Sequence, residues 1–172
     1  MALSNKERVG RVIDRVTEAL VPFIIREYRK VHGKRYMDVI EQTLDTNAYG
    51  LPAAAKASDE ALAKTLDAQS SFNLMLRHPQ WRDIFQDKLG HIGRSYVSEL
   101  YKARVDWAHQ KPFSIDEAYR VADTARRLLE MISASKEAEE VNEIATTLLR
   151  MQFDAEAKKA KKVAQTEKAE EV

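Results

Sequence analysis

Apolar residues recur every three or four positions along most of this chain, a spacing typical of amphipathic helices. The first such segment follows Ser4 and Glu7, whose spacing predicts a capping box at a helix N-terminus. Pro22 lies inside the segment and predicts a kink or a split, because proline removes one hydrogen bond of the helical ladder. Gly33 is the expected end of this helix.

The rest of the chain predicts further helices separated by turn residues. Gly50 and Pro52 lie in a segment that favours a loop, and Ser114 with Glu117 predicts a second capping box. The remaining expected elements are a short helix over 36–44, a loop over 47–58, a helix from Ser58 or Asp59 to Pro79, a turn or short helix over 81–89, and helices over about 93–108, 115–132 and 137–153.

The last part of the chain differs in composition from what precedes it. Residues 154–172 contain five lysines and five acidic residues, and almost no large apolar side chain. Such a segment cannot bury a hydrophobic face. We therefore expect a helical domain over 1–153, followed over 154–172 by a charged helical extension, a linker or a disordered tail.

Composition agrees with a single all-α domain built as a bundle of five or six helices. The chain has 172 residues, of which 44% are hydrophobic, with only 5 Gly and 4 Pro. A net charge of +1 excludes a protein that coats nucleic acid through overall charge, so any such contact must be local. The absence of cysteine and of a signal-peptide pattern suits the cytoplasm. The longest apolar run, Ala19 to Ile25, is too short to span a bilayer.

The candidate chemistry lies at Arg104 and His109, where a long helix is expected to meet a loop. A guanidinium can hold a phosphate and an imidazole can move a proton near neutral pH. Both side chains can serve one site only if the helix ends near His109 or if two chains contribute across a dimer, and residues 110–112 favour such an ending. A purely structural alternative pairs Arg104 with Asp106 or Glu99 and makes His109 an ordinary helix-end residue.

Several short segments occur in an order that resembles a known superfamily. They are Ser4 to Gly10, Ala19 to Phe23, Leu66 to Gln69, Trp81 with Phe85 and Leu89, Glu99 with Leu100, Arg104-x4-His109, and Trp107 to Gln110 leading into Pro112 to Ser114. Together they resemble the HEPN superfamily (higher eukaryotes and prokaryotes nucleotide-binding), whose usual signature is Arg-x4-6-His. The likeness is closest to the branch named for a eukaryotic nuclear RNA-surveillance endoribonuclease, and it covers about residues 4 to 150.

The resemblance implies a metal-independent endoribonuclease that acts as a homodimer without a cofactor. It implies that His109 performs acid–base chemistry and that Arg104 stabilises the phosphate, leaving a 2′,3′-cyclic phosphate on the product. Asp106 is expected either to orient one of them or to cap the helix. In prokaryotes such domains often precede P-loop ATPases in phage-defence loci, which makes an ATPase or another defence subunit a candidate partner.

Residues expected to contact RNA, including tRNA, lie in two places. Lys102, Trp107 and Lys111 surround the Arg104–His109 segment, and Trp107 is expected either to stack on a base or to belong to the core. Arg26, Arg29 and Lys30 form a second basic cluster. The cluster favours either an RNA-backbone track or an ordinary solvated helix end.

The chain departs from the superfamily pattern directly after the arginine. Many members carry a polar residue there, commonly Asn, whereas this chain has Val105. The departure favours a non-catalytic dimerisation or docking module as the alternative function. A DNA-binding helix-turn-helix protein is disfavoured, because no tight turn precedes a basic recognition helix. The chain also has no glycine-rich phosphate loop and no histidine–carboxylate cluster typical of a zinc site.

Overall fold

The computed structural model describes residues 2–44 and 51–172, in which every regular element is helical and no strand is present. The α-helices are α1 (Asn5–His32), α2 (Tyr36–Leu44), α3 (Asp59–Thr65), α4 (Ala68–Leu76), α5 (Gln86–Ala108), α6 (Ile115–Met131) and α7 (Ser135–Glu170). Shorter turns of helix are η1 (Gly33–Arg35), η2 (Ala53–Lys56) and the π-helical η3 (Trp81–Phe85). The expected all-α bundle is confirmed. Part of the expected loop, including Gly50, lies outside the described residues.

Helix α1 is the long central helix, and its ends match the sequence prediction. The capping box is present, since the Ser4 hydroxyl accepts from the Glu7 N–H while the Glu7 carboxylate accepts from the Ser4 N–H. At the other end Gly33 adopts φ 56°, a conformation that glycine reaches without a Cβ penalty. Pro22 does not split the helix, which runs unbroken to His32.

The helix expected from Ser58 to Pro79 is in fact two helices, α3 and α4, so this prediction was wrong in its continuity. Leu66 is extended, with φ −76° and ψ 118°, and Asp67 caps α4. The Asp67 carboxylate accepts from the Ser70 N–H, and the Ser70 hydroxyl accepts from the Asp67 N–H. A reciprocal cap of this kind satisfies the backbone donors that a continuous helix would use, so the break is locally stable.

Helix α5 carries the candidate site and is broken near its start. Gly90 has φ 62° and ψ −171°, a conformation outside the helical region, so a regular helix runs only from His91 to Ala108. This agrees with the helix expected from about Gly93. Leu89, Val97 and Leu100 are buried, and they fix the face that α5 turns toward the core.

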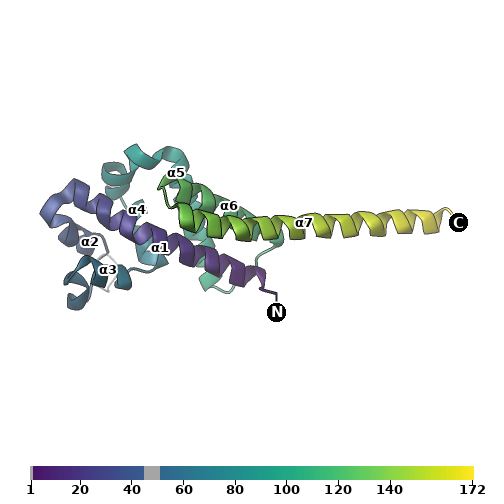
Figure 1. Ribbon diagram of the computed structural model, residues 1–172, viewed down its shortest axis with the longest axis horizontal. Coiled ribbons are helices and arrows are strands. Elements are labelled where there is room, and N and C mark those ends of the chain that lie inside the picture. The colour runs from purple at the N-terminus through teal and green to yellow at the C-terminus, as the bar shows by residue number, and fades with distance from the viewer. Residues whose placement is uncertain (1, 45–50) are drawn as a thin grey trace.

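The core forms where α1 packs against α4, α5, α6 and α7, and the longest shared surface joins α6 to α7 (Figure 1). Tyr28 is fully buried and donates a hydrogen bond from its hydroxyl to the Leu74 carbonyl of α4 at 2.5 Å. Burial raises the pKa of this phenol. The ring of Phe85 packs against the rings of both Phe23 and Trp81, with 6.0 Å between the centroids in each pair. Aromatic packing therefore holds η3 against α1.

Helix α7 leaves the bundle and projects well beyond it, as Figure 1 shows. Its buried residues end at Leu148, and Phe153 is already 62% exposed. From Glu156 onward every residue is exposed. None of the described helices is both long and apolar enough to cross a membrane.

Candidate site at the C-terminal end of helix α5

Helix α5 ends beside the predicted site. Its last residue is Ala108, and the His109 N–H donates to the Val105 carbonyl at 3.0 Å, as in a last helical turn. Gln110 then adopts φ 61°, and Ser114 caps α6 through the predicted capping box with Glu117. The His109 side chain is exposed, and no described residue forms a hydrogen bond or ion pair with its imidazole. The imidazole is therefore accessible to a bound molecule.

Arg104 is held on the opposite side by a polar contact between two helices. Its Nη1 donates to the Gln69 Oε1 of α4 at 2.6 Å. The Gln69 Nε2 in turn donates to the Tyr101 hydroxyl at 3.1 Å. All three side chains are half-buried. A hydrogen bond to a charged group in a partly desolvated setting contributes about 1.5–3 kcal/mol, so this chain of contacts fixes where the guanidinium lies.

The two candidate catalytic side chains therefore do not share one face of a single chain. His109 follows Arg104 by five positions, which is about 140° around an α-helix and roughly 7.5 Å along its axis. The His109 N–H keeps its helical bond to Val105, so this separation applies even though α5 ends here. Arg104 meanwhile contacts α4 through Gln69.

Asp106 contacts two lysines rather than either catalytic candidate. Its carboxylate lies 2.8 Å from the Lys102 Nζ and 3.1 Å from the Lys111 Nζ. Hydrogen bonds from Lys102, the larger cause, and from Lys111 lower the pKa of Asp106. The carboxylate joins the end of α5 to the loop that follows it, and the Lys111 N–H also donates to the Asp106 carbonyl.

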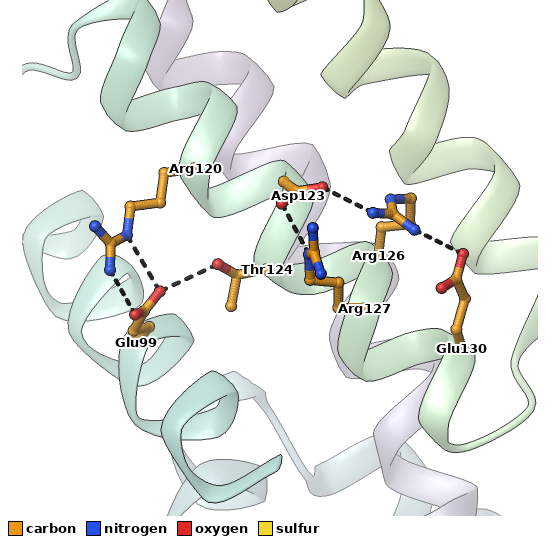
Figure 2. Close-up of polar contacts among 7 residues, drawn as sticks. All are labelled: Glu99, Arg120, Asp123, Thr124, Arg126, Arg127 and Glu130. Atoms are coloured by element: carbon orange, nitrogen blue, oxygen red, sulfur yellow. Dashed lines mark hydrogen bonds and ion pairs between the residues drawn. The ribbon is translucent and has the colours of Figure 1, made fainter. Parts of the chain in front are cut away.

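The alternative partners considered for Arg104 were wrong. Asp106 is occupied by the two lysines, and Glu99 accepts from Arg120 at 2.7 Å and from the Thr124 hydroxyl at 3.1 Å (Figure 2). These hydrogen bonds lower the pKa of Glu99, with Arg120 the largest cause. The partner of Arg104 is instead the neutral amide of Gln69, and no carboxylate among residues 2–44 and 51–172 forms an ion pair with the guanidinium.

Trp107 lies on the surface between α5 and the start of α1. It is 37% exposed, and its indole ring covers Gly10, where an added Cβ would lie 2.9 Å from the indole Nε1. The Lys6 ammonium lies 5.7 Å from the ring centroid. Lys6 also donates to the Gln110 side chain, and Asn5 donates to the Phe113 carbonyl at 3.1 Å. The first turn of α1 therefore fixes the loop around His109.

A groove of about 490 Å³ lies between α5 and α6, next to this loop. It is lined by the apolar residues Leu100, Ala103 and Phe113 and also by Lys102 and Lys111. Neither Arg104 nor His109 lines it.

The second predicted basic cluster is divided by the structure. Arg29 pairs with Asp59 of α3 and stacks on Tyr36, 4.5 Å from the ring centroid. Arg26 and Lys30 instead contact Glu27. Arg26 lies sixteen residues beyond Gly10 on the same helix, about 24 Å along its axis, so this cluster is remote from the Trp107 segment.

Gln69 was identified from the sequence only as the end of the Leu66 to Gln69 segment of the family resemblance, and no role was predicted for it. A polar side chain among Leu62, Leu66 and Phe72 was the available signal, since a half-buried amide requires partners. Its partners could not be named without the packing of α4 on α5. Across residues 2–44 and 51–172, no group of three or more His, Asp or Glu side chains is arranged to hold a metal ion.

An all-helical domain with an Arg-x4-His motif at the end of a long helix defines the class of HEPN domains. Residues 11–133 match the family model described as Swt1-like HEPN. The match covers most of the chain and includes the Arg104–His109 segment, so the chain belongs to the Swt1-like HEPN family. No curated protein and no solved structure matches the chain. The matched region ends at Ser133, before α7 begins.

Proposed function

We propose that this protein is a metal-independent endoribonuclease of the HEPN type. The observation that carries the proposal is the presence, at one end of α5, of an exposed His109 imidazole with no hydrogen-bond partner among the described residues and of an Arg104 guanidinium that a neutral amide holds in place. The first group can transfer a proton, and the second can bind phosphate oxygens without being neutralised by a carboxylate. The HEPN family as a class covers RNA-related nucleases and docking modules.

The proposed reaction uses the 2′-hydroxyl of the RNA as the nucleophile. The 2′-oxygen attacks the adjacent phosphorus while the bond from phosphorus to the 5′-oxygen breaks, leaving a 2′,3′-cyclic phosphate and a free 5′-hydroxyl. One imidazole takes the 2′-hydroxyl proton and another protonates the departing 5′-oxygen. Arg104 binds the non-bridging oxygens, whose negative charge grows in the transition state.

A homodimer supplies the two imidazoles that this reaction uses. Within one chain Arg104 contacts α4 while His109 lies about 140° further around α5. Two copies that place the ends of their α5 helices across one cleft would bring both pairs to a single phosphate. Lys102 and Lys111, bound to Asp106 at this end of the helix, would then attract the flanking RNA backbone, and the exposed edge of Trp107 would stack on a base.

The chemistry is tested by the product ends and by a modified substrate. An RNA with a single 2′-deoxy nucleotide at the mapped cleavage position lacks the nucleophile, so cleavage there should stop while other positions are still cut. Products should carry 2′,3′-cyclic phosphate and 5′-hydroxyl ends. Unchanged cleavage of the deoxy-substituted RNA would refute this mechanism.

The alternative function is a docking module for a partner ATPase or another defence subunit. It is favoured by Val105, which replaces the polar residue common after the arginine, and by α7, whose exposed residues 156–172 project from the bundle (Figure 1). The proposed domain boundary at Phe153 separates this extension from the catalytic unit. A role in prokaryotic phage defence or in an RNA-targeting stress response, in the cytoplasm, belongs to the endoribonuclease proposal.

A further inference from the structure

The far end of α1 carries a cluster of positive charge that is distinct from the Arg104–His109 site. Three cations converge on a single oxygen, the Oε1 of Glu27, and they come from both α1 and α5. The Lys88 Nζ lies 2.9 Å from it, the Lys30 Nζ 3.2 Å and the Arg26 Nε 3.7 Å. The Glu27 side chain is only 8% exposed, whereas those of the three cations are 45–57% exposed.

One buried carboxylate cannot neutralise three cations. Burial by itself would raise the pKa of Glu27, but the hydrogen bonds from Lys88 and Lys30 outweigh it and the pKa is lowered. Glu27 therefore remains ionised and acts as an anchor beneath the positive side chains. The charged ends of Arg26, Lys30 and Lys88 stay in contact with solvent.

Aromatic rings extend the cluster to a fourth cation. Arg26 and Lys88 lie over the Phe23 ring, 5.6 and 5.4 Å from its centroid. Arg94 lies over the Trp81 ring at 5.6 Å, and it pairs with no carboxylate among the residues the structure describes. Phe23 and Trp81 are joined through Phe85, so Arg26, Lys88 and Arg94 lie over one connected group of aromatic rings.

The surface at the end of α1 and the start of α5 carries an excess of positive charge, unlike the arginine-rich surface of α6. On α6, Arg120, Arg126 and Arg127 are matched by nearby carboxylates, as Figure 2 shows. At the cluster, Arg82 is paired with Asp83. Even when Asp87, the sequence neighbour of Lys88, is counted together with Glu27 against the four cations, an excess of two positive charges remains. We name Arg26, Lys30, Lys88 and Arg94 the α1–α5 basic cluster.

We propose that the α1–α5 basic cluster is a second binding site for the phosphate backbone of RNA, away from the site of cleavage. This inference rests on the proposal that the protein acts on RNA. Lysine and arginine that are held in place bind phosphates with little loss of side-chain freedom. The cluster lies about 24 Å along α1 from Gly10 and Trp107, and Arg26 is about 160° around the helix from Gly10. An RNA strand bound at both places would therefore pass around the domain rather than along one face.

The test measures RNA binding without cleavage. In a His109→Ala background, binding of a fluorescein-labelled single-stranded RNA is followed by anisotropy between about 50 and 200 mM salt. The test variant is Arg26→Gln/Lys30→Gln/Arg94→Gln, which keeps the Lys88–Glu27 hydrogen bond and so protects the fold. The matched control is Lys158→Gln/Lys159→Gln/Lys162→Gln, three exposed lysines of α7. Circular dichroism checks that both variants are folded.

We expect the cluster variant to bind RNA at least tenfold more weakly than the parent protein. The slope of log K against log salt concentration should become less steep by about 0.7 for each neutralised phosphate contact. The control variant should bind like the parent protein. Equal weakening of both variants, or no weakening of the cluster variant, would overturn the inference, as would absence of RNA binding by the parent protein. A wild-type protein that binds RNA through the cluster but does not cleave RNA would refute the proposed function and would still support this inference.

Discussion

The Arg104 guanidinium donates a hydrogen bond to the Gln69 side-chain oxygen at 2.6 Å, and this contact joins α5 to α4. Because the amide is neutral, it orients the guanidinium without cancelling its charge. Gln69 therefore acts as a positioning residue for the group that is proposed to bind the phosphate.

Replacing Gln69 with alanine should reduce RNA cleavage about tenfold or more, because Arg104 would lose its orientation. The effect should appear mainly in kcat, while Gln69→Glu, which pairs with the guanidinium and neutralises it, should be at least as harmful. Tyr101→Phe removes only the outer hydrogen bond and serves as a control with a smaller effect. A Gln69→Ala protein with full activity would remove Gln69 from the mechanism.

The Glu27 carboxylate should contribute to stability in a pH-dependent way. Its pKa is lowered in the folded protein, so its contribution is present above its ordinary value of about 4.5 and is lost as the pH falls through the folded-state pKa. Glu27→Gln should cost about 1 kcal/mol at pH 7, a modest amount because the lysine partners are exposed to solvent.

The measurement is the free energy of unfolding of both proteins from pH 7 down to about pH 3. The difference between wild type and Glu27→Gln should shrink as the pH is lowered. A difference that stays constant over this range would contradict a role for the charge of Glu27.

Adding a methyl group at Gly10 should displace Trp107. The added Cβ would lie 2.9 Å from the indole Nε1, which is closer than packed atoms approach. Gly10→Ala also favours the helix by about 1 kcal/mol, so the change in stability should be small while the tryptophan moves. In a Trp81→Phe background, which leaves Trp107 as the only tryptophan, its emission should shift to longer wavelength. An unchanged spectrum would mean that the ring does not rest on Gly10.

Removal of residues 154–172 should leave the bundle intact. No buried side chain lies in this segment, and the last buried residue of α7 is Leu148. We expect the free energy of unfolding to change by less than about 1 kcal/mol, with a loss of helical circular dichroism that matches the segment removed. A large loss of stability would contradict the proposed domain boundary at Phe153.

The sequence predicted the elements whose signals are local, and it failed where packing decides. Capping boxes at Ser4 and Ser114 fixed two helix starts, and Gly33 fixed a helix end, because cap chemistry involves neighbouring residues only. The break before α4 also has a local signal, because Ser70 completes the cap that Asp67 forms. The apolar spacing continues across this break, so the sequence predicted a single helix.

The candidate site was predictable as a motif but not as a geometry. Arg104 and His109 were identified from their spacing, whereas the Gln69 contact depends on how α4 packs against α5. The basic cluster at the end of α1 was predicted as one group. Its division, with Arg29 bound to Asp59 and Lys30 joined to Lys88 through Glu27, required the tertiary structure.

The central claim is that His109 performs metal-free cleavage of RNA. The most direct measurement compares wild type, His109→Ala and His91→Ala on a mixture of tRNA and messenger RNA in excess EDTA, at matched oligomeric state. His91 is an exposed histidine of the same helix and controls for the loss of an imidazole. We predict cleavage by wild type and His91→Ala, and a loss of at least about 100-fold in His109→Ala. Equal cleavage by all three proteins, or no cleavage by folded wild-type dimer, would contradict the claim.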